Sequence, residues 1–259
     1  MYKNIKYFKI NNSNFTGIQY GFFSRLGGSS KKKNTSLNCS FNSGDKKEKV
    51  IKNIELTKKK LDLNLAKIKF LNQTHSTNVE LIDSQNFNTN IYADGSITID
   101  KKICLAILSA DCAPIFLFDK KNYFICALHS GWKGCLGNII RKAVKKIYNF
   151  GKNNNEIISI IGPCLGHSNF EVNEDFKKKF LNENLEYEKF FYCDQYSNKI
   201  HFNMRDLINF QLKEMSIHKI YNVKRDTYSE NGIFFSHRRA THENLLPTGR
   251  MINIIGFKQ

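Results

Sequence analysis

The chain has 259 residues and a formal net charge of +17, and this length fits one large domain or two small ones. It has no run of about 18 apolar residues, which a membrane-spanning helix needs, and its first residues lack the apolar core and cleavage site of a secretory signal. The lysines are scattered rather than clustered, which argues against a specific nucleic-acid surface. We therefore expect a single cytoplasmic domain over residues 1–259, without a membrane or nucleic-acid partner.

Apolar runs and amphipathic patterns predict alternating strands and helices. In chain order these are a strand at 17–24, a helix at 46–62, strands at 66–72, 77–82, 97–99, 103–109, 114–118 and 123–128, a helix from 136 to a stop at Gly151, a strand at 157–161, a helix at 173–181, strands at 189–193 and 199–202, a helix at 204–215, and strands at 219–223, 232–235 and 250–257, the last two joined by a loop. Adjacent strands among helices favour an α+β (mixed α/β) fold of packed mixed sheets flanked by helices.

Three polar residues end apolar runs of the predicted sheets. His75 follows one such run, and Cys112 and His129 follow two others. A thiol or imidazole set against apolar packing needs a partner or a metal to offset its desolvation. We therefore interpret His75, Cys112 and His129 as one site, formed where the strand ends converge.

Two imidazoles and one thiolate suit zinc, with a fourth position left open as in catalytic zinc sites. Such a metal lowers the pKa of bound water from 15.7 to about 7. Copper is the alternative metal, because blue-copper sites use the same three ligands with a long axial ligand that is often methionine. No methionine lies near these turns in the sequence, which disfavours copper.

The same atoms also fit a different chemistry. Cys112 could act as a thiolate nucleophile with His129 as its base and Asp111 or His75 as the orienting group, as in cysteine hydrolases. The seven cysteines show no CxxC spacing, so the others are expected to be reduced, and several to be core residues. A bound metal and a free nucleophile are mutually exclusive uses of the Cys112 sulfur.

A glycine turn near the N-terminus is a candidate phosphate site. Gly27 and Gly28 allow a ligand to approach the backbone closely, and the planar fork of the neighbouring Arg25 can hold a phosphate or carboxylate. A hairpin turn with a surface arginine explains the same residues. Arg238 and Arg239 are alternative phosphate ligands.

Other residues near the predicted site have both a functional and a structural interpretation. Asp111 is a candidate acid or base, or a carboxylate that caps the turn. Trp132 could stack on a base or pack beside the glycine turn. Cys164 could line a pocket or belong to the core.

Eight motifs in order resemble the YfiH family, also called the purine nucleoside phosphorylase or multicopper polyphenol oxidase (laccase) family, over nearly the whole chain. The motifs are SRLGGSS, LNQTHSTNV, ADGSIT, SADCAP, ALHSGWKG, IGPCLGHSNFEV, FFSHRR and TGRM. The resemblance implies mixed sheets flanked by helices and a mononuclear zinc site with His75, Cys112 and His129 as ligands.

The resemblance also implies an activity. The expected reactions are phosphate-dependent cleavage of adenosine, inosine, guanosine and methylthioadenosine, together with adenosine deamination. The expected partners are therefore small molecules, purine nucleosides and phosphate, with the protein a monomer or weak homodimer. Alternative functions are an editing hydrolase for cell-wall precursors such as UDP-MurNAc-L-serine, a copper polyphenol oxidase, and a basic RNA-associated protein that is not an enzyme.

Overall fold

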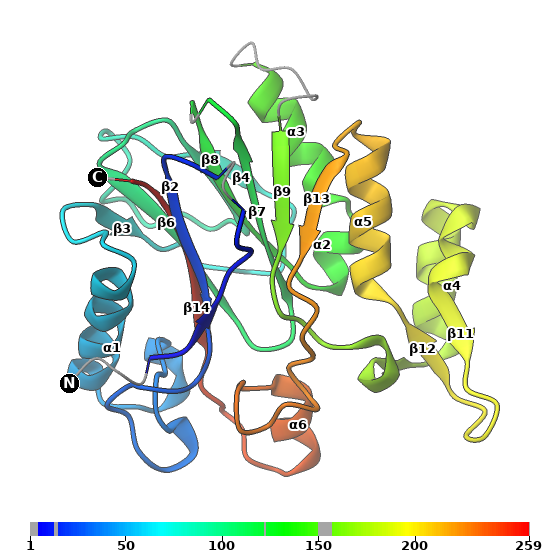
Figure 1. Ribbon diagram of the computed structural model, residues 1–259. Coiled ribbons are helices and arrows are strands. Elements are labelled where there is room, and N and C mark those ends of the chain that lie inside the picture. The colour runs from blue at the N-terminus through cyan, green and yellow to red at the C-terminus, as the bar shows by residue number, and fades with distance from the viewer. Residues whose placement is uncertain (1–4, 13–14, 122, 150–156, 259) are drawn as a thin grey trace.

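Two mixed β-sheets lie face to face in the computed structural model, which describes residues 5–12, 15–121, 123–149 and 157–258. The first sheet has the strand order β1-β2-β14-β6-β3, and its β3–β6 pair is parallel while the other pairs are antiparallel. Its strands are β1 Tyr7–Phe8, β2 Ile18–Phe23, β3 Lys67–Lys69, β6 Ile103–Ser109 and β14 Met251–Phe257 (Figure 1).

The second sheet has the order β13-β9-β7-β8-β5-β4, with parallel pairs at its two edges and antiparallel pairs between them. Its strands are β4 Val79–Leu81, β5 Gly95–Thr98, β7 Ala113–Asp119, β8 Ile125–Ser130, β9 Ile157–Ile161 and β13 Lys219–Asn222. The central strands β7, β8 and β9 are buried on both faces, as expected for a sheet that is covered on both sides.

The two sheets share one apolar core because successive side chains of a strand point to opposite faces. In β7, Phe116 and Phe118 point toward the first sheet, whereas Ile115 and Leu117 point toward the helices. The Phe116 ring stacks on Phe22 of β2, with centroids 4.7 Å apart and planes 15° apart. This aromatic pair joins the sheets near the middle of the sandwich.

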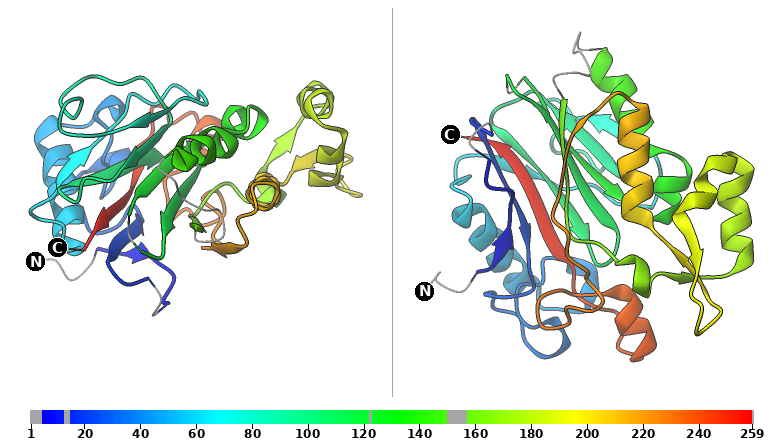
Figure 2. Two further views of the ribbon diagram at one scale, coloured as in Figure 1. Left: turned by 90° about the horizontal axis from the view of Figure 1, so that it is seen from above. Right: turned by 45° about the vertical axis from the view of Figure 1, so that its right-hand side comes forward.

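Helices cover the outer faces of both sheets (Figure 2). Helix α1, Lys47–Lys60, packs on the first sheet, and the second sheet carries α2 Trp132–Leu136, α3 Ile139–Tyr148 and α5 Met204–Glu214. A three-stranded sheet and helix α4 lie beside α5 (Figure 1). The strands of this sheet are β10 Glu171–Val172, β11 Phe191–Cys193 and β12 Ile200–Phe202, and α4 is Glu174–Glu183. Helix α6, His237–His242, precedes β14. No helix in the described part of the chain is long and apolar enough to cross a membrane.

The prediction of mixed sheets flanked by helices is confirmed, but individual elements differ. The prediction of a strand at 232–235 is wrong, because the Phe234 N–H donates to Glu230 O and forms a turn. Phe234 and Phe235 are both buried in this turn. The expected loop after it contains α6. The helix expected from residue 136 is broken at Asn138, which adopts φ 50° and caps α3. The predicted stop at Gly151 lies outside the described residues.

Replacing Phe116 with alanine tests the contact between the sheets. The side chain is fully buried, so we expect Phe116→Ala to lower the free energy of unfolding by about 3–5 kcal/mol, the usual cost of such a cavity. Urea unfolding followed by circular dichroism measures it. Phe41→Ala, which truncates a phenylalanine that is 49% exposed, is the control, and equal losses in both variants would contradict this packing.

Candidate metal centre

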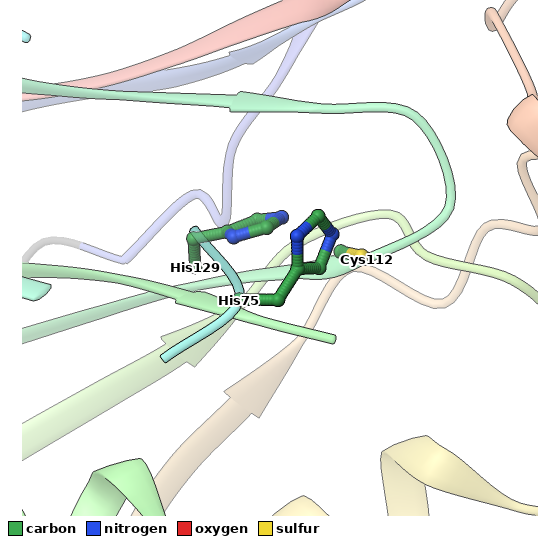
Figure 3. A group of neighbouring side chains, drawn as sticks. All are labelled: His75, Cys112 and His129. Atoms are coloured by element: carbon green, nitrogen blue, oxygen red, sulfur yellow. The ribbon is translucent and has the colours of Figure 1, made fainter. Parts of the chain in front are cut away.

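The three predicted ligands come together at one end of the sandwich. The ligand atoms of His75, Cys112 and His129 all lie within 4.8 Å of one another (Figure 3). His75 lies in the connection from β3 to β4, Cys112 in the connection from β6 to β7, and His129 in β8. Because β6 and β7 belong to different sheets, Cys112 lies where the chain crosses between them. That these residues bind a metal stays a prediction.

His129 is oriented by a buried carboxylate. Its side chain is 4% exposed, and its Nδ1 lies 2.8 Å from Oδ1 of Asp94, which is fully buried. The His129 N–H also donates to the Asp94 carbonyl, at 2.7 Å. An Nδ1–H that donates to a carboxylate leaves Nε2 as the basic nitrogen, which is the common arrangement of a metal-binding histidine.

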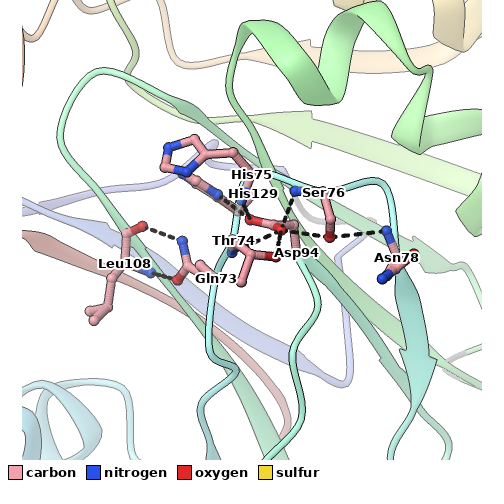
Figure 4. A network of polar contacts seen from close by, with 8 residues as sticks. All are labelled: Gln73, Thr74, His75, Ser76, Asn78, Asp94, Leu108 and His129. Atoms are coloured by element: carbon pink, nitrogen blue, oxygen red, sulfur yellow. Dashed lines mark hydrogen bonds and ion pairs between the residues drawn. The ribbon is translucent and has the colours of Figure 1, made fainter.

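The same carboxylate holds the loop that carries His75 (Figure 4). The backbone N–H groups of Thr74, His75 and Ser76 donate to the Asp94 oxygens at 3.1, 3.0 and 2.6 Å, and the Ser76 hydroxyl donates at 2.8 Å. The turn is tight, because His75 adopts a left-handed φ of 58°. Burial acts to raise the pKa of Asp94, but the hydrogen bonds and His129 outweigh it and hold the pKa well below its usual range.

Gln73 ties this loop to the first sheet. Its side-chain amide exchanges two hydrogen bonds with the backbone of Leu108 in β6, both at 2.8 Å (Figure 4). Leu108 lies four residues before Cys112 in the sequence. Gln73 therefore fixes the position of His75 relative to the turn that carries Cys112.

Gly131 leaves room for the ligands. A Cβ added at this position would lie 2.8 Å from the Cys112 sulfur and 3.3 Å from Cδ2 of His75. Only glycine lets β8 end this close to both side chains. Neither Gly131 nor Asp94 was among the predicted site residues, although Gly131 follows His129 in the LHSG motif and Asp94 belongs to the ADGSIT motif.

Cys112 and His129 perturb each other strongly. Burial raises the pKa of the Cys112 thiol, but the positive charge and hydrogen bond of His129, with a smaller effect of His75, outweigh it and lower the pKa to about 6. Burial lowers the pKa of His129, but Cys112 and Asp94 outweigh it and raise that pKa to about 9. At neutral pH the metal-free pair is therefore a thiolate beside an imidazolium, and a metal must displace the His129 proton.

A cavity of about 980 Å³ opens from these side chains. Its lining includes the three ligands and the predicted site residues Asp111, Trp132 and Arg238. The remaining predicted residues, all within the described part of the chain, do not line it; these are Arg25, Gly27, Gly28, Cys164 and Arg239, whose guanidinium donates to three backbone carbonyls. Met204 lines the same cavity, although no methionine lies near the three ligands in the sequence.

Asp111 is held firmly where it lines the cavity. Its carboxylate accepts hydrogen bonds from the Thr227 hydroxyl at 2.6 Å, the Ser236 hydroxyl at 3.0 Å and the Arg238 N–H at 2.7 Å. It thereby fixes the start of α6 to the turn that carries Cys112. A catalytic role for Asp111 stays a prediction.

The Arg25 guanidinium is occupied by backbone carbonyls of its own loop and of the turn before α6. It donates to the carbonyls of Thr35, Asn231 and Lys33 at 2.7, 3.1 and 3.3 Å and lies 4.4 Å from the centroid of the Phe235 ring. A Cβ at Gly28 would collide with the backbone at Ser36, so close packing accounts for this glycine. A phosphate site here stays a prediction, and these contacts support the structural interpretation.

Trp132 and Cys164 differ in their access to the cavity. Trp132 is half-buried and packs on Phe176 with ring centroids 5.3 Å apart, and Lys133 and Lys179 lie over its ring. Trp132 also lines the cavity. Cys164 is fully buried, and burial raises the pKa of its thiol, as for a core cysteine.

The fold and the site together define a class of protein: a sandwich of mixed sheets with one candidate metal centre where the sheets meet. The chain belongs to the family described as multi-copper polyphenol oxidoreductase laccase, whose model matches residues 19–258. This laccase-like family binds metal, and the His75, Cys112 and His129 group could hold one ion. The resemblance noted in the sequence is confirmed.

Similar proteins cover most of the chain. The purine nucleoside phosphorylase RC0672 of Rickettsia conorii is 35% identical over 175 residues, 68% of this chain and 72% of that protein. The structure of Neisseria meningitidis protein NMB0706 has a TM-score of 0.86 at 26% identity and covers 98% of this chain and 99% of its own. The hypothetical protein YfiH of Bacillus licheniformis has a TM-score of 0.84 at 27% identity, with 93% of each chain covered.

Asp94→Asn tests the support of the ligands. The change removes the carboxylate that orients His129 and the loop of His75, and we expect about 10- to 100-fold weaker zinc binding, as for other residues that orient metal ligands. Competition with a chromophoric chelator measures the affinity in protein shown to be folded by circular dichroism. Asp175→Asn, at a side chain that is 81% exposed, should bind zinc like the parent protein. Unchanged affinity in folded Asp94→Asn protein would contradict this role.

The lowered pKa of Cys112 predicts a distinctive pH dependence of alkylation. In metal-free protein that carries Cys193→Ser to remove the exposed thiol, Cys112 is the thiolate above about pH 6. Its rate of reaction with iodoacetamide should be nearly constant from pH 7 to 9 and fall as the pH drops through about 6, because only the thiolate reacts. Intact-mass spectrometry measures the rate. A rate that still rises through pH 8.5, as for an ordinary thiol, would exclude the thiolate–imidazolium pair.

Proposed function

We propose that this protein is a zinc-dependent purine nucleoside phosphorylase with adenosine deaminase activity. The observation that carries the proposal is the open three-residue ligand group beside a cavity of about 980 Å³, a size suited to a small-molecule substrate. The name of the Rickettsia relative, purine nucleoside phosphorylase, supports the reaction. The substrates proposed are adenosine, inosine, guanosine and methylthioadenosine.

The donor set fits zinc. His75, Cys112 and His129 supply two nitrogens and one sulfur, and their ligand atoms are close enough for one ion, with a fourth tetrahedral position open toward the cavity. When bound, zinc supplies a Lewis acid at that position. Copper is the alternative, because the family description names it and Met204 lines the same cavity. Met204 is only 2% exposed and packs in the hydrophobic core.

The residues of the chain have separate roles in this proposal. Asp94 keeps the proton on Nδ1 of His129 and fixes His75 through its backbone N–H. Asp111 anchors α6 at the edge of the cavity, and the exposed edge of Trp132 offers an apolar surface to a purine. We infer that water and nucleoside reach the ligands through the open cavity, which places the reaction beside Cys112.

Activity of Cys112→Ala tests this function. Zinc-loaded protein incubated with adenosine and phosphate should yield adenine and ribose 1-phosphate, and inosine with ammonia from deamination, all detected by liquid chromatography. Cys112→Ala removes the thiolate ligand, so both activities should fall to background, while Cys193→Ser, at an exposed cysteine, should retain them. Absence of turnover in zinc-loaded parent protein, or full turnover in Cys112→Ala, would refute the proposal.

A cysteine hydrolase is the second candidate for the function of this protein. The thiolate of Cys112 beside the imidazolium of His129 favours it, because such a pair is an activated nucleophile. The precursor UDP-MurNAc-L-serine is the substrate to test for a hydrolase. Chelators separate the candidates: they should abolish a zinc-dependent activity and increase one that needs the free Cys112 sulfur. Alkylation of Cys112 alone does not separate them, because it removes both a ligand and a nucleophile.

A further inference from the structure

Three basic residues form a basic wall of the cavity. His237 and Arg238 lie at the start of α6, and Arg250 lies immediately before β14. All of them line the cavity together with the metal ligands. Burial lowers the pKa of His237, and the positive charge of Arg250 lowers it further.

Neither arginine forms a salt bridge with a carboxylate in the described part of the chain. Within the described residues, Arg238 and Arg250 form no ion pair. The Glu171 carboxylate, also at the cavity, is paired with Lys199 at 2.9 Å, and Arg238 contacts only the Glu171 carbonyl. The negative charges of Cys112 and Asp111 act on Arg250 from nearby, but other donors take both Asp111 oxygens, and neither group bonds to the guanidinium directly. Partly buried guanidinium groups without a direct carboxylate partner favour an anionic ligand.

Each guanidinium group is held by hydrogen bonds from one of its nitrogens, and its other N–H groups are available to a ligand. Arg250 uses Nη1 on the carbonyls of Thr248 and Gly249, at 2.9 and 3.2 Å, and no acceptor in the described part of the chain takes its Nε or Nη2. Arg238 uses Nη1 on Glu171 O at 3.1 Å and lies over the Phe170 ring, 5.5 Å from its centroid. One nitrogen of each fork thus anchors the group, and the others remain available for the two-point contact that guanidinium makes with phosphate.

We propose that Arg250, Arg238 and His237 form the subsite for inorganic phosphate, beside the metal ligands. The proposal rests on the phosphorylase function above and assigns the phosphate to this wall instead of the Arg25 turn. In the reaction an oxygen of hydrogen phosphate bonds to C1′ of the ribose while the bond from C1′ to the purine breaks. The purine leaves with the electron pair and takes up the phosphate proton, so the products are the free base and ribose 1-phosphate.

Direct binding of inorganic phosphate tests the subsite without relying on turnover. Isothermal titration with phosphate would be done on the zinc-loaded parent protein and on Arg250→Gln, Arg250→Lys and Arg238→Gln. Arg141→Gln is the matched control, because Arg141 is exposed on α3. Metal-free Cys112→Ser protein separates phosphate held by the arginines from phosphate held by the metal. Thermal melting without phosphate verifies that each variant is folded.

We expect phosphate affinity to fall about tenfold or more in Arg250→Gln and Arg238→Gln, because each loses charge-assisted hydrogen bonds. Arg250→Lys should recover part of the affinity, since it keeps the charge and loses the planar fork. Arg141→Gln should match the parent protein, and metal-free Cys112→Ser should still bind phosphate in a way that depends on Arg250. Equal affinity in the parent and both glutamine variants, no binding by the parent, or binding that vanishes with the metal alone would overturn the proposal.

One further measurement distinguishes inorganic phosphate from a phosphate ester as the ligand of the subsite. A second distinguishes failure of the phosphorylase function from failure of the phosphate subsite. Adenosine monophosphate that binds through Arg250 more tightly than inorganic phosphate would overturn the assignment to free phosphate, because the subsite would then serve a phosphate ester. If Arg250-dependent phosphate binding occurs without nucleoside cleavage, the phosphorylase function fails and the anion subsite stands. If cleavage occurs and Arg250→Gln leaves the KM for phosphate unchanged, the function stands and the subsite fails.

Discussion

The buried carboxylate of Asp94 is the contact on which the site depends. It binds Nδ1 of His129 at 2.8 Å and the His75 N–H at 3.0 Å, across 35 and 19 positions of the sequence. An ionised carboxylate that is fully buried is costly unless it is hydrogen-bonded and paired. The donors of the Thr74–Ser76 loop meet this need, and the same bonds fix the direction of two of the three candidate ligands.

The third ligand is placed by topology. The chain passes from the first sheet to the second through the turn between β6 and β7, and Cys112 lies in that turn. Asp111, beside it, adopts a left-handed φ of 93° and anchors α6. One short connection therefore brings the thiol to the histidines and holds the basic residues at the start of α6 at the cavity. The metal ligands and the basic residues His237, Arg238 and Arg250 thus line the same cavity.

The sequence predicted the fold class and the meeting of the three candidate ligands, because apolar runs that end on His75, Cys112 and His129 are local signals. It did not predict Asp94, whose role comes from hydrogen bonds to distant residues. Arg25 resembled a phosphate ligand because nothing local showed that three backbone carbonyls would occupy its guanidinium. The paired Phe234 and Phe235 suggested a strand, since burial in a turn and burial in a sheet give the same apolar pattern.

Substitution with cobalt tests most directly whether His75, Cys112 and His129 bind one metal ion with a place left open. Cobalt(II) accepts the same ligands as zinc and absorbs visible light, with charge-transfer bands that report a bound thiolate. The account predicts that one equivalent of cobalt per chain gives a four-coordinate spectrum with thiolate bands, and that these bands disappear in Cys112→Ser. No saturable binding, or a spectrum that is the same in Cys112→Ser and the parent protein, would contradict it.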